Sequence, residues 1–146
     1  MQKLTSILLD NGRALEWASS VGLLSLAVTM ALPGETTLTQ GFEALRRAGL
    51  DDALAGVVLG IVSTARIAAL YINGSWRRSP MLRMIGAILG ASIYSMLAVG
   101  FAFPFLAENS PLGSEAGIFL TLALFDALSI YRSGGDVRHS QEFSRV

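Results

Sequence analysis

Residues 53–72, ALAGVVLGIVSTARIAALYI, decide the fold of this chain. The stretch holds one charged side chain, Arg66, and its 20 residues are about the length that a helix needs to cross the hydrocarbon core of a bilayer. Asp51 precedes it as a candidate helix N-cap, and Asn73 and Gly74 follow it as stop signals. The stretch therefore predicts a transmembrane helix.

Three other stretches have the same apolar character and length. They cover residues 14–32, 81–103 and 115–131. Pro104 is expected to stop the third of the four stretches, and Gly134 with Gly135 to cap the last. Of the 146 residues, 52% are hydrophobic and 15% are charged, whereas soluble domains carry about 25% charged residues. We therefore predict one all-α membrane domain, residues 1–146, with four transmembrane helices.

Two short segments outside these stretches show helical spacing. Residues 1–11 place apolar side chains on one face, which predicts an amphipathic helix lying at the membrane surface. Between the first two stretches, Leu38, Phe42 and Leu45 are spaced i, i+4, i+7. This spacing favours a short interfacial helix over a plain surface loop, and Gly49 is its candidate C-cap.

The basic residues predict the orientation, because Lys and Arg gather in cytoplasmic loops. Eight of them fall on one side of the membrane: Lys3, Arg13, Arg77, Arg78, Arg83, Arg132, Arg138 and Arg145. The opposite side carries only Arg46 and Arg47. The same side gathers aromatic residues of the interfacial type, namely Trp17, Tyr71, Trp76 and Tyr131. We expect a bacterial inner membrane, with both termini and the polar tail of residues 132–146 in the cytoplasm.

Two charged residues, Arg66 and Asp126, lie inside the apolar stretches. An unpaired charge at the centre of a transmembrane helix is unfavourable by about 2.5 kcal/mol or more. Each lies five residues before a tyrosine, Tyr71 or Tyr131, in helices that run in the same direction, so their depths match. We therefore predict an intramembrane ion pair. It could join helices or line a water-filled cavity or ion path, and Arg66 could instead extend alone to the headgroups.

Small residues recur four apart in three of the stretches. They are Gly56 with Gly60, Gly86 with Gly90, and Gly117 with Thr121. This spacing puts the small residues on one helix face, where two backbones can approach closely. The pattern therefore predicts helix packing at these five glycines, either within a four-helix bundle or between copies of the chain.

The composition argues against several kinds of chemistry. The 11 basic and 11 acidic residues balance, so nothing predicts a surface for nucleic acid. The chain has no cysteine, and its single histidine, His139, lies in the polar tail, so no metal or haem site is expected. No nucleophile with a base, phosphate-binding loop or zinc ligand set is recognisable. We therefore expect neither enzyme activity nor a cofactor.

Three classes of function stay open. In size and in its charged tail, the chain resembles small membrane proteins of holin type, and this resemblance implies self-association into a pore or permeability lesion. The alternatives are a non-catalytic accessory or scaffold subunit of a larger membrane complex and a small transporter using Arg66 and Asp126. Small multidrug transporters need a glutamate embedded in their first helix, but Glu16 is expected at the interface beside Trp17. We favour a homo-oligomer in contact with lipid and other membrane proteins.

Overall fold

The computed structural model of the chain describes residues 13–39, 41–75, 80–108 and 111–143. In order, its helices are α2 (Ala14–Ala31), η2 (Thr36–Leu38), α3 (Glu43–Arg47), α4 (Asp52–Ser75), α5 (Pro80–Glu108) and α6 (Ser114–Phe143). Four of them, α2, α4, α5 and α6, are long and apolar enough to cross a membrane. The prediction of an all-α, four-helix membrane protein is therefore confirmed. The amphipathic helix predicted over residues 1–11 lies outside the described residues.

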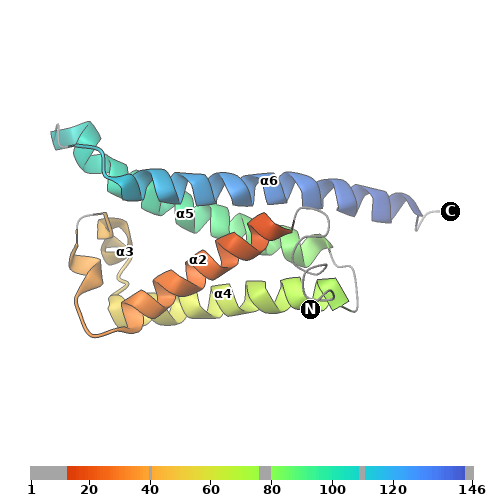
Figure 1. Cartoon of the computed structure of the whole chain (residues 1–146), viewed down its shortest axis with the longest axis horizontal. Helices are drawn as coiled ribbons and strands as arrows, with labels where there is room; N and C mark the ends of the chain where they lie inside the picture. The colour runs from red at the N-terminus through yellow and green to blue at the C-terminus, as the bar shows by residue number, and fades with distance from the viewer. Residues whose placement is uncertain (1–12, 40, 76–79, 109–110, 144–146) are drawn as a thin grey trace.

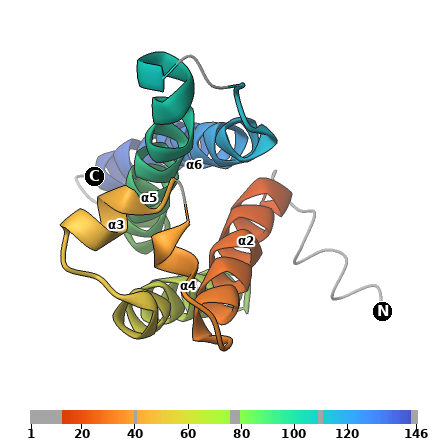
Figure 2. The same cartoon turned by 90° about the vertical axis from the view of Figure 1, so that its left-hand side faces the viewer.

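The four long helices form two hairpins (Figures 1 and 2). The first hairpin, residues 14–75, packs α2 against α4, and the second hairpin, residues 80–143, packs α5 against α6. Contacts between the hairpins are fewer and run mainly from α2 to α6 and from α4 to α5. Figure 1 shows the start of α2 and the end of α6 toward the same end of the bundle, and α6 projects beyond the other helices.

Each long helix buries one stripe and exposes the rest of its surface. In α2, the buried residues are Glu16, Ser19, Ser20, Leu23, Ala27 and Met30, at the spacing of one helix face. Large apolar side chains point outward from every long helix, and Ile61 of α4 and Leu106 of α5 are 66% and 72% exposed. Apolar exposure on this scale suits helices surrounded by lipid.

A layer of aromatic side chains closes the end of the bundle at which α2 finishes. Phe42, from the segment that joins α2 to α4, meets Phe101 of α5 edge to face, with ring centroids 5.0 Å apart. Phe101 in turn packs on Phe119 of α6 at 5.3 Å. Phe42 and Leu45 belong to the main apolar core, so the connecting segment is part of the bundle.

The same segment differs from the single interfacial helix predicted for it. It forms two short helices, η2 and α3, separated by Gly41, whose φ of +100° favours glycine. Leu38 is 56% exposed and does not share the buried face of Phe42 and Leu45. The predicted cap at Gly49 is confirmed by its φ of +78°. Asp51 also caps α4 as predicted, since its Oδ1 accepts a hydrogen bond from the amide of Leu54 at 2.8 Å.

Three predicted helix ends are wrong. Helix α4 continues through Asn73 and Gly74 to Ser75. Helix α5 continues through Pro104 to Glu108, although the proline ring removes one backbone donor, a change that membrane helices tolerate. Helix α6 continues through Gly134 and Gly135 to Phe143, so much of the predicted tail is helical. Neither glycine has the positive φ of a left-handed cap, and glycine inside a helix is unfavourable by only about 1 kcal/mol relative to alanine.

The chain packs so closely at Gly100 that this position should not tolerate a larger side chain. A Cβ atom on Gly100 would overlap the carbonyl oxygen of Gly41, a backbone atom that cannot rotate away. We expect Gly100→Ala to lower the free energy of unfolding by about 1–3 kcal/mol, as overpacking does. Gly135→Ala is the matched control, because nothing lies within 4 Å of its Cβ position, and it should cause no loss. Denaturation in mixed micelles measures both, and equal stability of the two variants would contradict this packing.

A buried network of four charged side chains

Arg66 of α4 and Asp126 of α6 form a bidentate ion pair between the hairpins. Nη1 donates to Oδ2 at 2.9 Å and Nη2 donates to Oδ1 at 2.6 Å. The two side chains are 5% and 0% exposed. Nη2 also donates to Oγ of Ser19 in α2 at 3.1 Å. Arg66 therefore does not extend to the headgroups, and its fork engages the carboxylate in the geometry that is strongest for this pair.

Gly86 and Gly90 of α5 make room for the Arg66 side chain. A Cβ on Gly86 would lie 3.2 Å from Cγ of Arg66, and a Cβ on Gly90 would overlap Nη1 of Arg66 and Oδ2 of Asp126. We had expected these glycines to bring two backbones together. In the structure they instead leave space for a charged side chain, because a methyl group at Gly90 would displace the ion pair.

The other predicted packing glycines have different surroundings. Gly56 faces α2, where its Cβ position lies 3.4 Å from the carbonyl oxygen of Ala27, and Gly60 faces Cβ of Ala27 at 4.0 Å. These two glycines therefore contribute to packing within the first hairpin. No heavy atom of a neighbouring element lies within 4 Å of the Cβ position of Gly117, which is exposed on α6.

A second ion pair joins Glu16 of α2 to Arg83 of α5. Nε of Arg83 donates to Oε2 at 3.0 Å and Nη2 donates to Oε1 at 2.5 Å. The side chains of Arg83 and Glu16 are only 10% and 6% exposed. The sequence did not reveal this pair, because Glu16 was expected at the membrane interface and Arg83 was expected among the basic residues on the cytoplasmic side. Helical spacing could have revealed the burial of Arg83. Arg83 precedes Gly86 and Gly90 by three and seven residues, so it lies on the same helix face as these two glycines.

The two ion pairs lie close together, because Arg66 of one pair and Glu16 and Arg83 of the other line the same small cavity, and we refer to them together as the charge network. Among the described residues, each long helix supplies one of its members: Glu16 from α2, Arg66 from α4, Arg83 from α5 and Asp126 from α6. Each hairpin therefore holds one cation and one anion, and both ion pairs cross between hairpins. A cavity of about 10 Å³, enough for about one water molecule, lies between the pairs and is lined by Glu16, Ser20, Arg66 and Arg83.

Hydroxyl groups add further hydrogen bonds to this interior, although the buried Oγ of Ser133 in α6 has no partner among the described residues. Tyr94 of α5 is fully buried and donates its hydroxyl to the carbonyl oxygen of Ser19 at 2.6 Å, which adds another link between the hairpins. Ser20, Ser63 and Ser129 donate to carbonyl oxygens three or four residues earlier in their own helices. Most polar atoms of this interior therefore form hydrogen bonds with other residues of the bundle.

In this arrangement each charged group of the two ion pairs is held by its partner. Each carboxylate of the network is held by two guanidinium nitrogens, which removes it as a base or a ligand. Across the ranges that the structure describes, no group of three or more His, Asp or Glu side chains could hold a metal ion. No family model matches the chain, and no curated protein or solved structure matches it either.

The Arg66–Asp126 pair predicts a strong energetic coupling. Arg66→Leu or Asp126→Leu leaves the other charge unpaired, and breaking a buried pair in this way lowers stability by about 3–5 kcal/mol in soluble proteins. We expect a somewhat smaller loss in a membrane, because the unfolded helices also remain in lipid. The double variant should regain much of that loss, since no charge stays buried.

The control for this cycle is the exposed pair of Arg47 and Glu43, whose side chains are 75% and 46% exposed. Its coupling should be below about 1 kcal/mol. Unfolding free energies of the single and double leucine variants measure both cycles. Additive losses at Arg66 and Asp126 would show that these side chains do not meet.

Proposed function

We propose that this chain is a non-catalytic integral membrane protein that works as a homo-oligomer. The closed interior of the bundle supports this proposal most directly. Two bidentate ion pairs fill one half, the aromatic layer of Phe42, Phe101 and Phe119 fills the other, and the cavity between the pairs has room for about one water molecule. A cavity of this size has no space for a substrate or a file of ions between the ion pairs, and for this reason we place the function on the outer surface.

The outer face of α6 supports self-association with a second copy of the chain. Gly117 and Thr121 are both exposed there, and the Thr121 hydroxyl is turned back to the carbonyl oxygen of Gly117 at 2.8 Å. Small residues four apart allow two membrane helices to approach closely, and the chain already uses this spacing at Gly56 and Gly60. We propose that α6 of one copy packs against α6 of another through this face.

The closed interior also bears on where permeability would arise. We propose that the assembly acts in a holin-like way and opens a path between copies, because a path through one chain would have to break two buried ion pairs and the aromatic layer. An accessory subunit of a larger membrane complex would use the same face of α6 for a different chain. The two proposals predict different results with purified protein. A holin-like assembly should make vesicles leak by itself, and an accessory subunit should not.

A small transporter is a second candidate, and the cavity beside Arg66 favours it. Widening this cavity requires Glu16 and Arg83 to separate, because both side chains line it. For a transporter, replacing Arg66 and Asp126 together by leucine would restore the fold and abolish flux. If the ion pair is purely structural, the double variant would keep both the fold and the activity of the parent protein.

The assembly proposal predicts an effect of bulk at Gly117. Gly117→Leu should convert oligomers to monomers, because the side chain keeps the two helices apart. Ala127→Leu is the matched control, since it adds bulk to another exposed position of α6. Photobleaching steps of labelled protein in vesicles count the subunits, and dye release from the same vesicles reports permeability. A monomeric parent protein, or oligomers that survive Gly117→Leu, would contradict the proposal.

The proposed orientation has a separate test. With both termini in the cytoplasm, a fluorescent reporter fused after Val146 should mature, and a phosphatase fused there should stay inactive. Fusions after Gly113, in the connection between α5 and α6, should behave in the opposite way. An active phosphatase after Val146 would reverse the orientation of the whole chain.

A further inference from the structure

Arg66 has a second anion nearby, within its own hairpin. Besides its two hydrogen bonds to Asp126, its Nη2 donates to Oγ of Ser19 in α2 at 3.1 Å. Glu16 precedes Ser19 by three residues and is buried on the same face of α2. Three residues span about 4.5 Å along a helix axis, so the backbone position of Glu16 is about one helical turn from the residue that Arg66 already contacts.

The small cavity of the charge network lies between Arg66 and this second anion. Glu16, Ser20 and Arg66 all line it. Gly86 of α5 lines it as well, beside the aliphatic part of the arginine side chain, where a Cβ would lie 3.2 Å from Cγ of Arg66. A close-packed interior resists a change of rotamer, but a cavity and a glycine leave room for one. The guanidinium therefore has space on the side that faces Glu16.

The distribution of the four charges allows each hairpin to balance its own. Glu16 and Arg66 belong to the first hairpin, and Arg83 and Asp126 belong to the second. If the hairpins separated with the present pairing, four unpaired charges would face lipid, which is strongly unfavourable. If Arg66 moved to Glu16, the first hairpin would hold a complete ion pair. The second hairpin would keep one cation and one anion, so neither hairpin would carry a net buried charge.

The contacts between the hairpins at the opposite end of the bundle offer no such exchange. There, Phe42 of the first hairpin packs edge to face on Phe101 of the second. The carbonyl oxygen of Gly41 also lies so close to Gly100 that a Cβ would overlap it. These contacts join apolar rings and backbone, and neither has a second partner of the same kind in its own hairpin. A separation that begins at the charges would therefore leave this end in place as a hinge.

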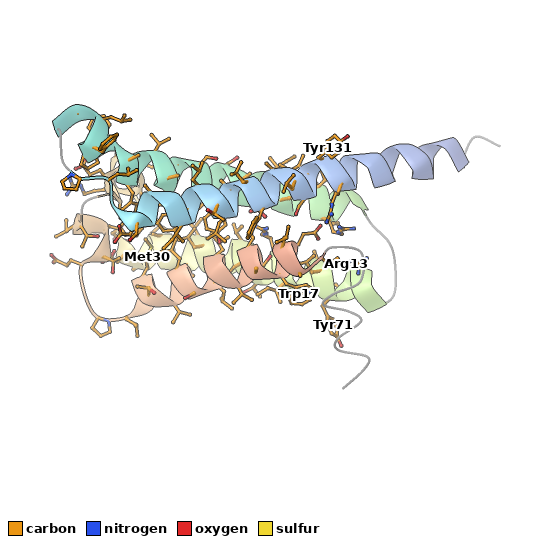
Figure 3. The ribbon with its side chains drawn as sticks, turned by 45° about the horizontal axis from the view of Figure 1, so that its top comes forward. Arg13, Trp17, Met30, Tyr71 and Tyr131 are labelled. Carbon is orange, nitrogen blue, oxygen red and sulfur yellow. The ribbon has the colours of Figure 1, made fainter. Side chains whose placement is uncertain are left out.

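We propose that Arg66 exchanges Asp126 for Glu16, and that this exchange allows the hairpins to separate at the end of the bundle that holds the charge network. In the closed state, both ion pairs cross between the hairpins. In the open state, Arg66 and Glu16 pair inside the first hairpin, and the aromatic layer keeps the other end closed. Figure 3 shows Tyr71 and Tyr131, residues of the interfacial type, toward the end that opens. The exchange does not depend on assembly through α6.

A pair of substitutions in the second hairpin tests whether Glu16 and Arg66 can meet. Asp126→Leu and Arg83→Leu each leave one charge unpaired, so each should lower the free energy of unfolding. Together they form the exchange variant, in which only Glu16 and Arg66 remain, and it should regain most of the loss although the replaced residues belong to different ion pairs. Asp126→Leu with Glu16→Leu is the matched control. It leaves two cations, so its losses should at least add.

Distances between spin labels test the opening itself, in vesicles with an excess of unlabelled protein. One pair of labels, at Tyr71→Cys and Tyr131→Cys, reports on the end that holds the charges. A second pair, at Leu38→Cys and Ile118→Cys, uses exposed positions near the aromatic layer. In the parent, both pairs should give one narrow distribution. In the exchange variant, the first distance should lengthen and the second should stay as in the parent.

Three results would overturn this proposal. The first is additive loss in the exchange variant, or its failure to fold where Arg66→Leu with Asp126→Leu folds, because Glu16 and Arg66 then do not meet. The second is recovered stability with parent distances at both label pairs, because the exchange then does not separate the hairpins. The third is equal lengthening at both label pairs, because the hairpins then move apart as a whole and the aromatic layer is no hinge.

Discussion

The pairing of buried charges between the two hairpins is the interaction on which the rest of the structure depends. Apolar helix faces gain little from each other in lipid, so helices need close packing or polar contacts to associate. Here each hairpin contributes one cation and one anion to the two buried ion pairs, and each pair joins one hairpin to the other. This requirement sets the register of the hairpins, because Arg66 can reach Asp126 only through the space at Gly90.

The charge network also divides the bundle into two unlike halves. The half that contains Arg66 and Glu16 is polar, and the half that contains Phe42 and Phe101 is apolar and aromatic. A continuous passage would have to break both the ion pairs and the aromatic layer. The polar interior therefore stabilises the fold, and large apolar side chains occupy the outer faces of the helices.

Sequence patterns predicted the four helices and the meeting of Arg66 with Asp126, because a charge deep in an apolar stretch stands out. Glu16 and Arg83 lie near helix ends, where a charge is normally solvated, so their burial became visible only in three dimensions. Spacing could not separate the roles of the glycines either, since Gly56 faces a backbone and Gly90 faces an ion pair at the same interval. Pro104 and Gly134 were misread as helix ends because a membrane helix tolerates both.

The distance between two spin labels, one on each hairpin, tests the central role of the buried charges most directly. The chain has no cysteine, so Tyr71→Cys and Tyr131→Cys, at exposed positions of α4 and α6, give two unique labelling sites. In vesicles that contain an excess of unlabelled protein, so that distances between copies do not contribute, the labelled protein should show one narrow distance distribution. Adding Asp126→Leu should broaden it, because the hairpins lose their register. An unchanged narrow distribution with Asp126→Leu would contradict the account.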